Sequence, residues 1–115
     1  MSPRSRSSTA ARVQAHAPVF AALGDKTRLS LVARLADGRP HSISQLTAGS
    51  RLTRQAITKH LRVLESAGMV HSSREGRESL FELSPQPIKG IREYLDLVSE
   101  QWDQALSRLK SFVED

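Results

Sequence analysis

Two helix-start signals lie close together in the middle of the chain, and they restrict its fold more than any other feature. Ser42 and Gln45 match the capping box, in which each side chain satisfies a free amide at the start of a helix. Thr53 follows as a second N-cap, eleven residues after Ser42. The space between them holds one short helix, about 43–48, and a tight turn. The sequence therefore predicts two consecutive helices joined by a turn, the second over 53–67.

The second helix has one apolar and one polar face. Helical periodicity in TRQAITKHLRVL, residues 53–64, places Ile57, Leu61 and Leu64 inward. The opposite face has no acidic residue before Glu65. Arg and Lys donate to guanine, Gln pairs with adenine, and Thr contacts bases or a thymine methyl group. The alternative to DNA contact is that this is an ordinary solvent-exposed polar face. The candidate DNA contacts on this face are Arg54, Gln55, Thr58, Lys59 and Arg62.

His60 lies at the edge between the two faces of this helix. It is a further candidate contact to a phosphate or base. The alternative is that it braces the segment that follows.

That following segment changes from helical to strand periodicity. Val70–Arg74 and Glu78–Leu83 have the composition of two short strands, and Glu75-Gly76 is predicted as their turn because glycine supplies a positive φ. The tip of such a hairpin presents Arg74 and Arg77. These side chains would lie along an adjacent groove or DNA backbone, and a solvated turn is the alternative.

Two more helices are predicted before the central pair. The first covers about 12–23 and follows a basic tail, residues 1–11, whose lack of periodicity predicts disorder. The second covers about 26–37, with Asp25 as its N-cap. The apolar residues expected to face inward are Val13, Ala17, Phe20 and Leu23 on the first helix and Leu29, Val32, Leu35 and Ala36 on the second.

The last predicted helix, residues 85–115, carries a long apolar seam. Its apolar residues alternate spacings of four and three from Ile91 to Phe112, an unbroken heptad pattern. So broad a stripe exceeds the need of one small core, so one side can pack on a partner; the alternative is that all of it covers the chain's own core. The residues predicted at a dimer interface are Phe20, Ile91, Leu95, Val98, Trp102, Leu106, Leu109 and Phe112.

Charge and composition narrow the class of protein. The net charge is +5, with +4 over residues 51–77 and −2 over residues 85–115. Basic segments attract nucleic acid. The absence of cysteine excludes disulfides and thiolate metal sites. No carboxylate pair, nucleophile with a base or phosphate-cradling glycine loop is evident, so we do not expect an enzyme.

The chain also lacks the signals of membrane association. No apolar run approaches the ~20 residues needed to span a bilayer, and the N-terminus lacks the apolar stretch of a secretory signal. We therefore expect no membrane contact and a cytoplasmic location.

The chain resembles the ArsR/SmtB (arsenic-repressor) family of winged helix-turn-helix regulators. The resemblance is carried by FAALGDKTRLSLVARLADG, SISQLTAGSRLTRQAITKHLRVLESAGMV and SSREGRESLFEL, and it covers about residues 13–113. It implies a mainly α winged helix-turn-helix fold over residues 12–115, with a long C-terminal dimerisation helix. It also implies a DNA-binding homodimer that usually represses its own or a neighbouring operon. On the family pattern the main contacts would be Gln55, Thr58, Lys59 and His60 in the groove and Arg74 and Arg77 on the wing.

The chain departs from the metal-sensing members of that family. Their arsenic and cadmium sensors use a cysteine pair in the helix before the reading helix, and this chain has none. Their zinc and nickel sensors use histidines on the last helix, and residues 85–115 contain none. The resemblance therefore implies a metal-independent subgroup without a cofactor. The four histidines, which show no paired ligand spacing, are His16, His41, His60 and His71.

Together these observations predict a homodimeric repressor that binds double-stranded DNA. It would read an inverted repeat through the 53–67 helix and the 70–83 wing, because a two-fold dimer places two reading helices about one DNA turn, ~34 Å, apart. A protein-interaction module on the same fold is the alternative. A repressor also needs a state of lower DNA affinity, so we expect an effector, either a small molecule or a partner protein.

Overall fold

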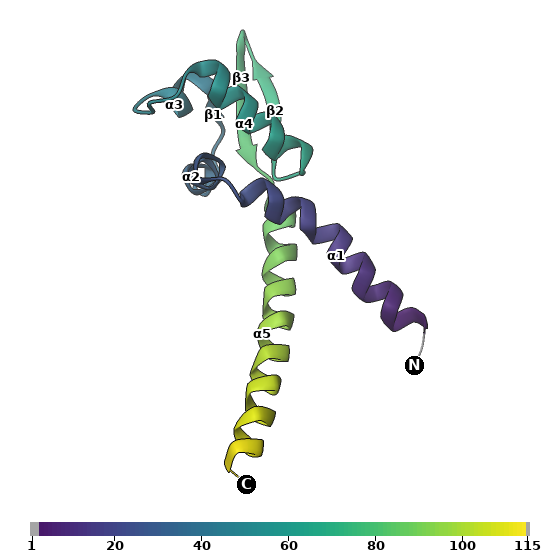
Figure 1. Cartoon of the computed structure of the whole chain (residues 1–115). Coiled ribbons are helices and arrows are strands. Elements are labelled where there is room, and N and C mark those ends of the chain that lie inside the picture. The colour runs from purple at the N-terminus through teal and green to yellow at the C-terminus, as the bar shows by residue number, and fades with distance from the viewer. Residues whose placement is uncertain (1–2, 115) are drawn as a thin grey trace.

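A computed structural model describes residues 3–114 of the chain, with side chains from residue 10 onward. Five helices and three short strands follow one another among these residues. The helix-turn-helix pair and the sheet gather at one end, while the last helix, α5 (Pro85–Glu114), extends away from them (Figure 1). The principal extents of 66 × 33 × 21 Å reflect that extension. The elements are α1 (Pro3–Leu23), α2 (Lys26–Leu35), β1 (His41–Ser42), α3 (Ile43–Thr47), α4 (Arg54–Ser66), β2 (Val70–Glu75), β3 (Glu78–Leu83) and α5 (Pro85–Glu114).

The predicted N-caps of α2, α3 and α4 are confirmed. Asp25 accepts hydrogen bonds from two amides in the first turn of α2, at 2.9 and 3.0 Å. Ser42 Oγ accepts from the amide of Gln45 at 3.1 Å, while Gln45 Oε1 accepts from the amide of Ser42 at 2.9 Å, which completes the capping box. Thr53 Oγ1 accepts from the amide of Ala56 at 3.1 Å. Local side-chain chemistry therefore sets where α2, α3 and α4 begin.

The wing is a hairpin within a three-stranded antiparallel sheet of order β1-β3-β2. Glu75 pairs with Glu78, so the connecting turn is Gly76-Arg77 and not the predicted Glu75-Gly76. Gly76 still supplies the positive φ, at +64°. Strand β1 was not predicted, because a strand of two residues shows no periodicity. It places Ser42, the cap of α3, directly against β3.

Phe81 is the centre of the core. It lies on the middle strand, opposite His41 of β1 and Ser72 of β2, and its side chain is fully buried. Helices α2 and α3 contact its strand, and the buried residues of α1, α4 and α5 belong to the same apolar core. The buried apolar residues are Val19, Ala22, Leu31, Leu35, Ile43, Leu46, Ile57, Leu61, Leu64, Met69, Val70, Phe81 and Ile91.

Some inward-facing positions were predicted wrongly on α1 and α2. Leu29 is 55% exposed and Ala36 is also exposed, whereas Leu31 and Leu35 are buried. Successive helical residues are turned by about 100°, so Leu29 lies about 200° from Leu31 and Ala36 about 100° from Leu35. Leu29 and Ala36 therefore do not lie on the side of the helix that buries Leu31 and Leu35.

On α1 the core-facing side chains are Val19 and Ala22. The predicted residues Val13 and Ala17 are exposed, and Phe20 and Leu23 are half-buried. The predicted apolar face of α1 therefore exists, but its first half is not used by the core of the chain.

Helix α1 begins earlier than predicted. It starts at Pro3, so the segment 1–11, predicted to be disordered, is helical from residue 3; residues 1 and 2 lie outside the described part. Proline is well tolerated in the first helical turn, and no glycine or proline interrupts residues 4–17. Apolar periodicity, on which the prediction rested, is absent there and could not reveal the helix. None of the described helices is long and apolar enough to cross a membrane.

Two leucines test the position of the core. Leu46 on α3 is fully buried, whereas Leu29 on α2 is 55% exposed. We expect Leu46→Ala to lower the free energy of unfolding by about 2–5 kcal/mol, because it leaves a cavity. The matched substitution Leu29→Ala should change it by less than about 0.5 kcal/mol. Urea unfolding at one fixed protein concentration measures both, and equal losses would contradict this packing.

Candidate nucleic-acid interface

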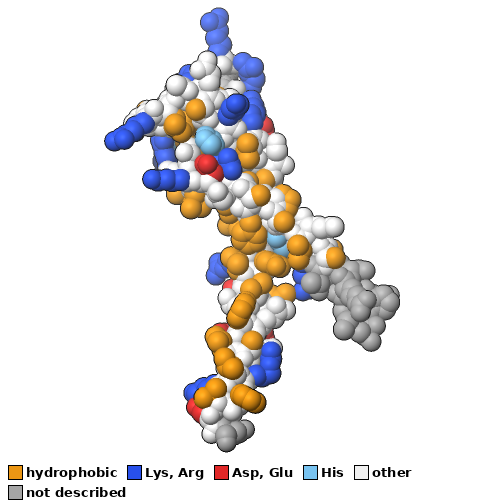
Figure 2. All heavy atoms as spheres, viewed as in Figure 1, with side chains coloured by type: hydrophobic (Ala, Val, Ile, Leu, Met, Phe, Trp, Pro, Cys, Tyr) orange, Lys and Arg blue, Asp and Glu red, His pale blue; other side chains and the backbone are white. Residues whose placement is uncertain are grey.

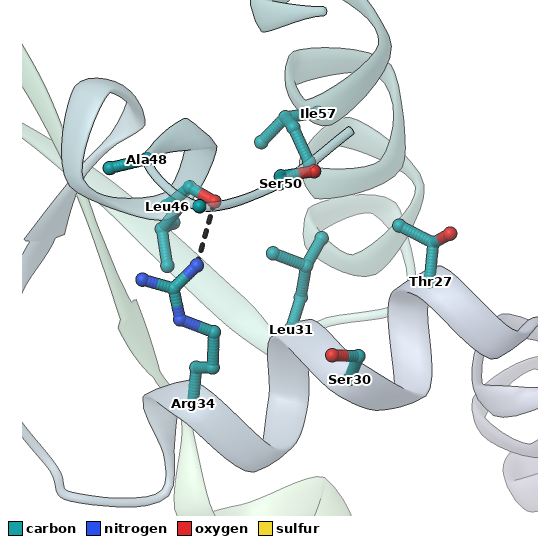
Figure 3. A pocket seen from close by; sticks show the side chains of 9 residues that line it. Thr27, Ser30, Leu31, Arg34, Leu46, Ala48, Ser50 and Ile57 are labelled. Carbon is teal, nitrogen blue, oxygen red and sulfur yellow. Dashed lines mark hydrogen bonds between the residues drawn. The ribbon is translucent and has the colours of Figure 1, made fainter. Parts of the chain in front are cut away.

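Helices α3 and α4 form a helix-turn-helix whose turn is held from behind by α2. Gly49 adopts a φ of +78° in the turn, a conformation that favours glycine. The guanidinium of Arg34, on α2, donates to the carbonyl oxygen of Leu46 at 2.7 Å (Figure 3) and to that of Gln45 at 2.8 Å. These are carbonyls of the last turn of α3, which have no partner within the helix. Arg34 therefore completes the C-terminal end of α3.

A pocket of about 350 Å³ lies between α2 and the turn, beside Arg34 (Figure 3). Its walls combine apolar core residues with hydroxyl groups at the rim. The lining residues are Thr27, Ser30, Leu31, Arg34, Leu46, Ala48, Gly49, Ser50 and Ile57.

The outward face of α4 presents Gln55 and Lys59. Both side chains are exposed and make no hydrogen bond or ion pair with another described residue. Arg54 is also exposed and donates to Ser44 Oγ on α3 at 2.9 Å. The half-buried Thr58 donates its hydroxyl to the carbonyl of Arg54, four residues earlier, at 2.8 Å. Of the predicted contacts on α4, Gln55 and Lys59 are thus the freest to reach a ligand.

Arg62 faces the wing. Its Nη1 donates to Glu65 Oε1 at 2.7 Å, and its guanidinium carbon lies 5.4 Å from the centre of the Phe81 ring. Glu65 Oε2 accepts a hydrogen bond from the Ser72 hydroxyl of β2 at 2.6 Å. We call these four residues the α4–wing brace. The Ser72 hydroxyl, and then Arg62, hold the pKa of the Glu65 carboxyl below its ordinary value, so the charged form of Glu65 joins α4 to the wing.

His60 faces the opposite way, towards the junction of α1 and α2. Its Nδ1 lies 3.3 Å from Arg28 Nη1 and 3.8 Å from Asp25 Oδ2, and one quarter of its side chain is exposed. It does not brace the hairpin, which was the alternative to DNA contact. Its contacts join α4 to the segment that starts α2.

The wing and the turn carry further basic residues. Arg74 on β2 and Arg77 in the hairpin turn are both exposed. Arg51, exposed in the turn before α4, was not among the predicted contacts. Its position just before the N-terminus of a helix, where phosphates bind, is the signal that could have identified it. Figure 2 shows Lys and Arg side chains around this end of the molecule and a band of hydrophobic side chains along α5.

The predicted dimer residues divide into three groups by burial. Ile91 is buried in the core of its own chain, where the first turns of α5 pack against α1, so little of its side chain is left for the predicted partner contact. Phe20 is half-buried against Tyr94, with ring centres 6.1 Å apart, and Val98 is also half-buried. The remaining seam residues are exposed by 47–82%: Leu95, Trp102, Leu106, Leu109 and Phe112.

Within residues 3–114 no group of three His, Asp or Glu side chains is arranged to hold a metal ion. The histidines contact other elements of the chain instead. His41 Nε2 lies 2.9 Å from Asp37 Oδ2, His71 Nδ1 lies 2.9 Å from Ser84 Oγ, and the His16 ring centre lies 5.0 Å from that of Tyr94.

The α4–wing brace predicts an effect of acid on stability. Because the pKa of Glu65 is lowered on folding, its contribution is present above its ordinary value of 4.5 and is lost as the pH falls through the lower folded value. Glu65→Gln should lower the free energy of unfolding at pH 7 by about 0.5–1 kcal/mol. It should also flatten the loss of stability below pH 4.5.

The control for this variant is Glu78→Gln, which removes the same charge from the exposed start of β3. Urea unfolding between about pH 3 and 7 compares the two, a range that includes the ordinary pKa of a glutamate. A wild-type acid profile in Glu65→Gln would show that the brace does not stabilise the fold.

Comparison with known proteins identifies this architecture. A family model described as a helix-turn-helix domain matches residues 23–73, which run from the end of α1 into the wing. The chain is 37% identical over 79 residues to the HTH-type transcriptional regulator YuzN of Bacillus subtilis, covering 64% of this chain and 86% of that protein. It is 31% identical over 93 residues to the HTH-type transcriptional regulator Rv2034 of Mycobacterium tuberculosis, covering 81% of this chain and 83% of that protein.

A solved structure agrees with these relatives. The ArsR-like transcriptional regulator from Rhodococcus sp. RHA1 superposes with a TM-score of 0.78 at 32% identity, covering 89% of this chain and 93% of that chain. The prediction of a DNA-binding regulator and not an enzyme is thereby confirmed. The chain belongs to the ArsR-like family of winged helix-turn-helix transcriptional regulators.

Proposed function

We propose that the chain is a homodimeric repressor that reads an inverted repeat with α4 and contacts the flanking DNA with its wing. The observation that carries this proposal is the outward face of α4, on which Gln55 and Lys59 are exposed and unpaired among the described residues. Gln bonds to adenine with two hydrogen bonds, and Lys donates to the O6 and N7 acceptors of guanine. The helix dipole adds a positive field at the N-terminus of α4, towards the phosphates.

The other predicted DNA contacts lie beside the two reading residues or on the wing. Arg54 and Thr58 flank the two reading residues on the first turns of α4 and would contact the backbone or neighbouring bases. Arg74 and Arg77 on the wing would neutralise phosphates, and such contacts give affinity without sequence preference. Arg62 and His60 act within the chain in this proposal, since the Arg62 guanidinium lies over the Phe81 ring of β3 and His60 contacts Arg28 of α2.

The exposed apolar residues of α5 support the homodimer in this proposal. Trp102, Leu109 and Phe112 are 65%, 58% and 82% exposed, and they follow one another at heptad spacing. A stripe of this kind is rarely left in water and is typical of a protein interface. The surplus of acidic residues over 85–115 keeps this part away from DNA. Two copies would place two α4 helices for successive turns of the major groove, and a dimer seated there would exclude other DNA-binding proteins from the site.

We place this regulator in the cytoplasm, with its DNA. The first experiment is selection of bound fragments from total genomic DNA with the purified chain. We expect a small set of fragments that share an inverted repeat with half-sites spaced by about one DNA turn. If no fragment is retained at low salt, the surface instead serves a protein partner and the proposal fails.

Two substitutions separate base reading from backbone contact. Lys59→Ala should weaken binding to the selected fragment by about 1–3 kcal/mol and leave binding to unrelated DNA nearly unchanged. Arg74→Ala should weaken binding to both and lower the slope of log affinity against log salt by about one per protomer.

Titrations with both DNAs at several salt concentrations measure these effects, with the circular dichroism spectrum as the check that each variant folds. An unchanged preference in Lys59→Ala would remove α4 from the reading role. An unchanged salt slope in Arg74→Ala would show that the wing does not contact the DNA phosphates.

A matched pair of substitutions on α5 tests the dimer. Leu109 lies on the apolar seam, while Ser107 is about 200° around the helix from Leu109 and from Ala105, on the far side. Leu109→Lys should raise the dimer dissociation constant at least about tenfold, because it removes apolar burial and introduces a charge. Ser107→Lys adds the same charge and should leave it unchanged. Sedimentation equilibrium distinguishes them, and a monomeric wild type would overturn the proposal.

A further inference from the structure

His60 stands where three helices meet, and its contacts give it a role that the outward face of α4 does not share. Its neighbours on α4 are Lys59, which points outward, and Leu61, which is fully buried. Its ring is directed to the α1–α2 junction, where Asp25 and Arg28 lie. A change at His60 therefore acts on the helix that would read DNA and on the two helices behind it.

Arg28 connects these parts. Its Nε donates to the carbonyl oxygen of Ala22, in the last turn of α1, at 2.6 Å. Its Nη1 lies 3.3 Å from His60 Nδ1 on α4. One planar guanidinium thus spans from the end of α1 to the middle of α4, which a lysine ammonium could not do with the same geometry.

Nδ1 of His60 also faces a carboxylate. Asp25 Oδ2 lies 3.8 Å away and is fixed in place, since it accepts from the amides of Thr27 and Arg28 as the N-cap of α2. The hydrogen bond from the Arg28 amide lowers the pKa of the Asp25 carboxyl, so Asp25 is charged at neutral pH. Asp25 and Arg28 are the charged groups that meet the His60 ring, one from the α1–α2 turn and one from α2.

The protonation state of the ring decides which of the two it bonds. A neutral imidazole with its proton on Nε2 accepts from Arg28 through Nδ1. A protonated imidazole has a proton on both nitrogens, cannot accept, and is attracted to Asp25. Histidine is the side chain that changes charge between about pH 5 and 8.

We propose that Arg28 is a positioning residue for α4, acting through neutral His60, and that protonation of His60 transfers its Nδ1 from Arg28 to Asp25 and so removes the contact that holds the middle of α4 to α2. This inference rests on the proposed reading role of α4. A helix that is held at its middle keeps its reading residues in register with the bases. Without this contact α4 keeps its buried side and its charge, but its reading residues are held less precisely.

The measurable consequence is a preference for sequence that depends on pH. Acid adds positive charge, which strengthens binding to all DNA alike. The ratio of affinities for the selected fragment and for unrelated DNA removes that general effect. In the wild type this ratio should fall about three- to tenfold between pH 8 and about pH 5.5, the size expected for one hydrogen bond.

Variants of His60 and Arg28 separate positioning from a general structural role. His60→Asn places an amide oxygen close to where Nδ1 lies, and that oxygen can accept from Arg28 without titrating. Its affinity ratio should stay high and flat with pH. His60→Ala and Arg28→Lys lose the contact and should give a low, flat ratio. The control is His71→Asn, which removes a histidine on the wing and should keep the wild-type profile.

The free protein provides a second readout that needs no DNA. Nitrogen-15 NMR of the His60 ring at about pH 8 should show a proton on Nε2 and an accepting Nδ1, and Arg28→Lys should shift the Nδ1 signal. A proton on Nδ1, or an unchanged signal in Arg28→Lys, would overturn the positioning role.

The two proposals fail in distinguishable ways. If no DNA fragment is selected, the proposed function fails while the NMR result still decides the contact between Arg28 and His60. If fragments are selected but the wild-type ratio is flat, or His60→Asn retains the pH profile, the positioning role fails and the proposed function stands.

Discussion

The burial of one side of α4 is the constraint on which the rest of the molecule depends. Ile57, Leu61 and Leu64 are almost completely buried among α2, α3 and the sheet. Each such side chain contributes roughly 1.5–3 kcal/mol when it leaves water. The helix cannot turn about its axis without exposing them, so the direction of Gln55 and Lys59 follows from the packing on the other side. A surface intended to bind DNA is in this way oriented by a surface that never meets it.

Features with a local cause could be predicted from the sequence. The caps at Asp25, Ser42 and Thr53 depend on side chains within three residues of the amides that they satisfy, and a sequence contains all of that information. The hairpin and the long last helix follow from clear periods. Strand β1 was missed because its two residues take their conformation from β3 and not from their own pattern.

Features set by tertiary contacts could not be predicted in the same way. A helical period identified His60 and Arg62 as polar residues of α4 but not their partners, which are 32 residues away for His60 and on the wing for the brace that includes Arg62. The exposure of Leu29 and the burial of Ile91 likewise depend on which side of each helix meets its neighbours. The candidate DNA contacts all remain predictions, and their exposed or half-exposed positions are compatible with that role: Arg54, Gln55, Thr58, Lys59, His60, Arg62, Arg74 and Arg77.

Arg34 has a consequence for how the helix-turn-helix opens. Helix α3 has five residues, too few to be stable by itself in water, since a helix must first overcome the cost of nucleation. Its first turn is closed by the capping box, and its last carbonyls are closed by a side chain that belongs to α2. Helix α3 therefore cannot persist as a helix after α2 detaches. Helices α2 and α3 should exchange their amide protons with solvent as one cooperative unit. Local unfolding would then open both helices together and not one after the other.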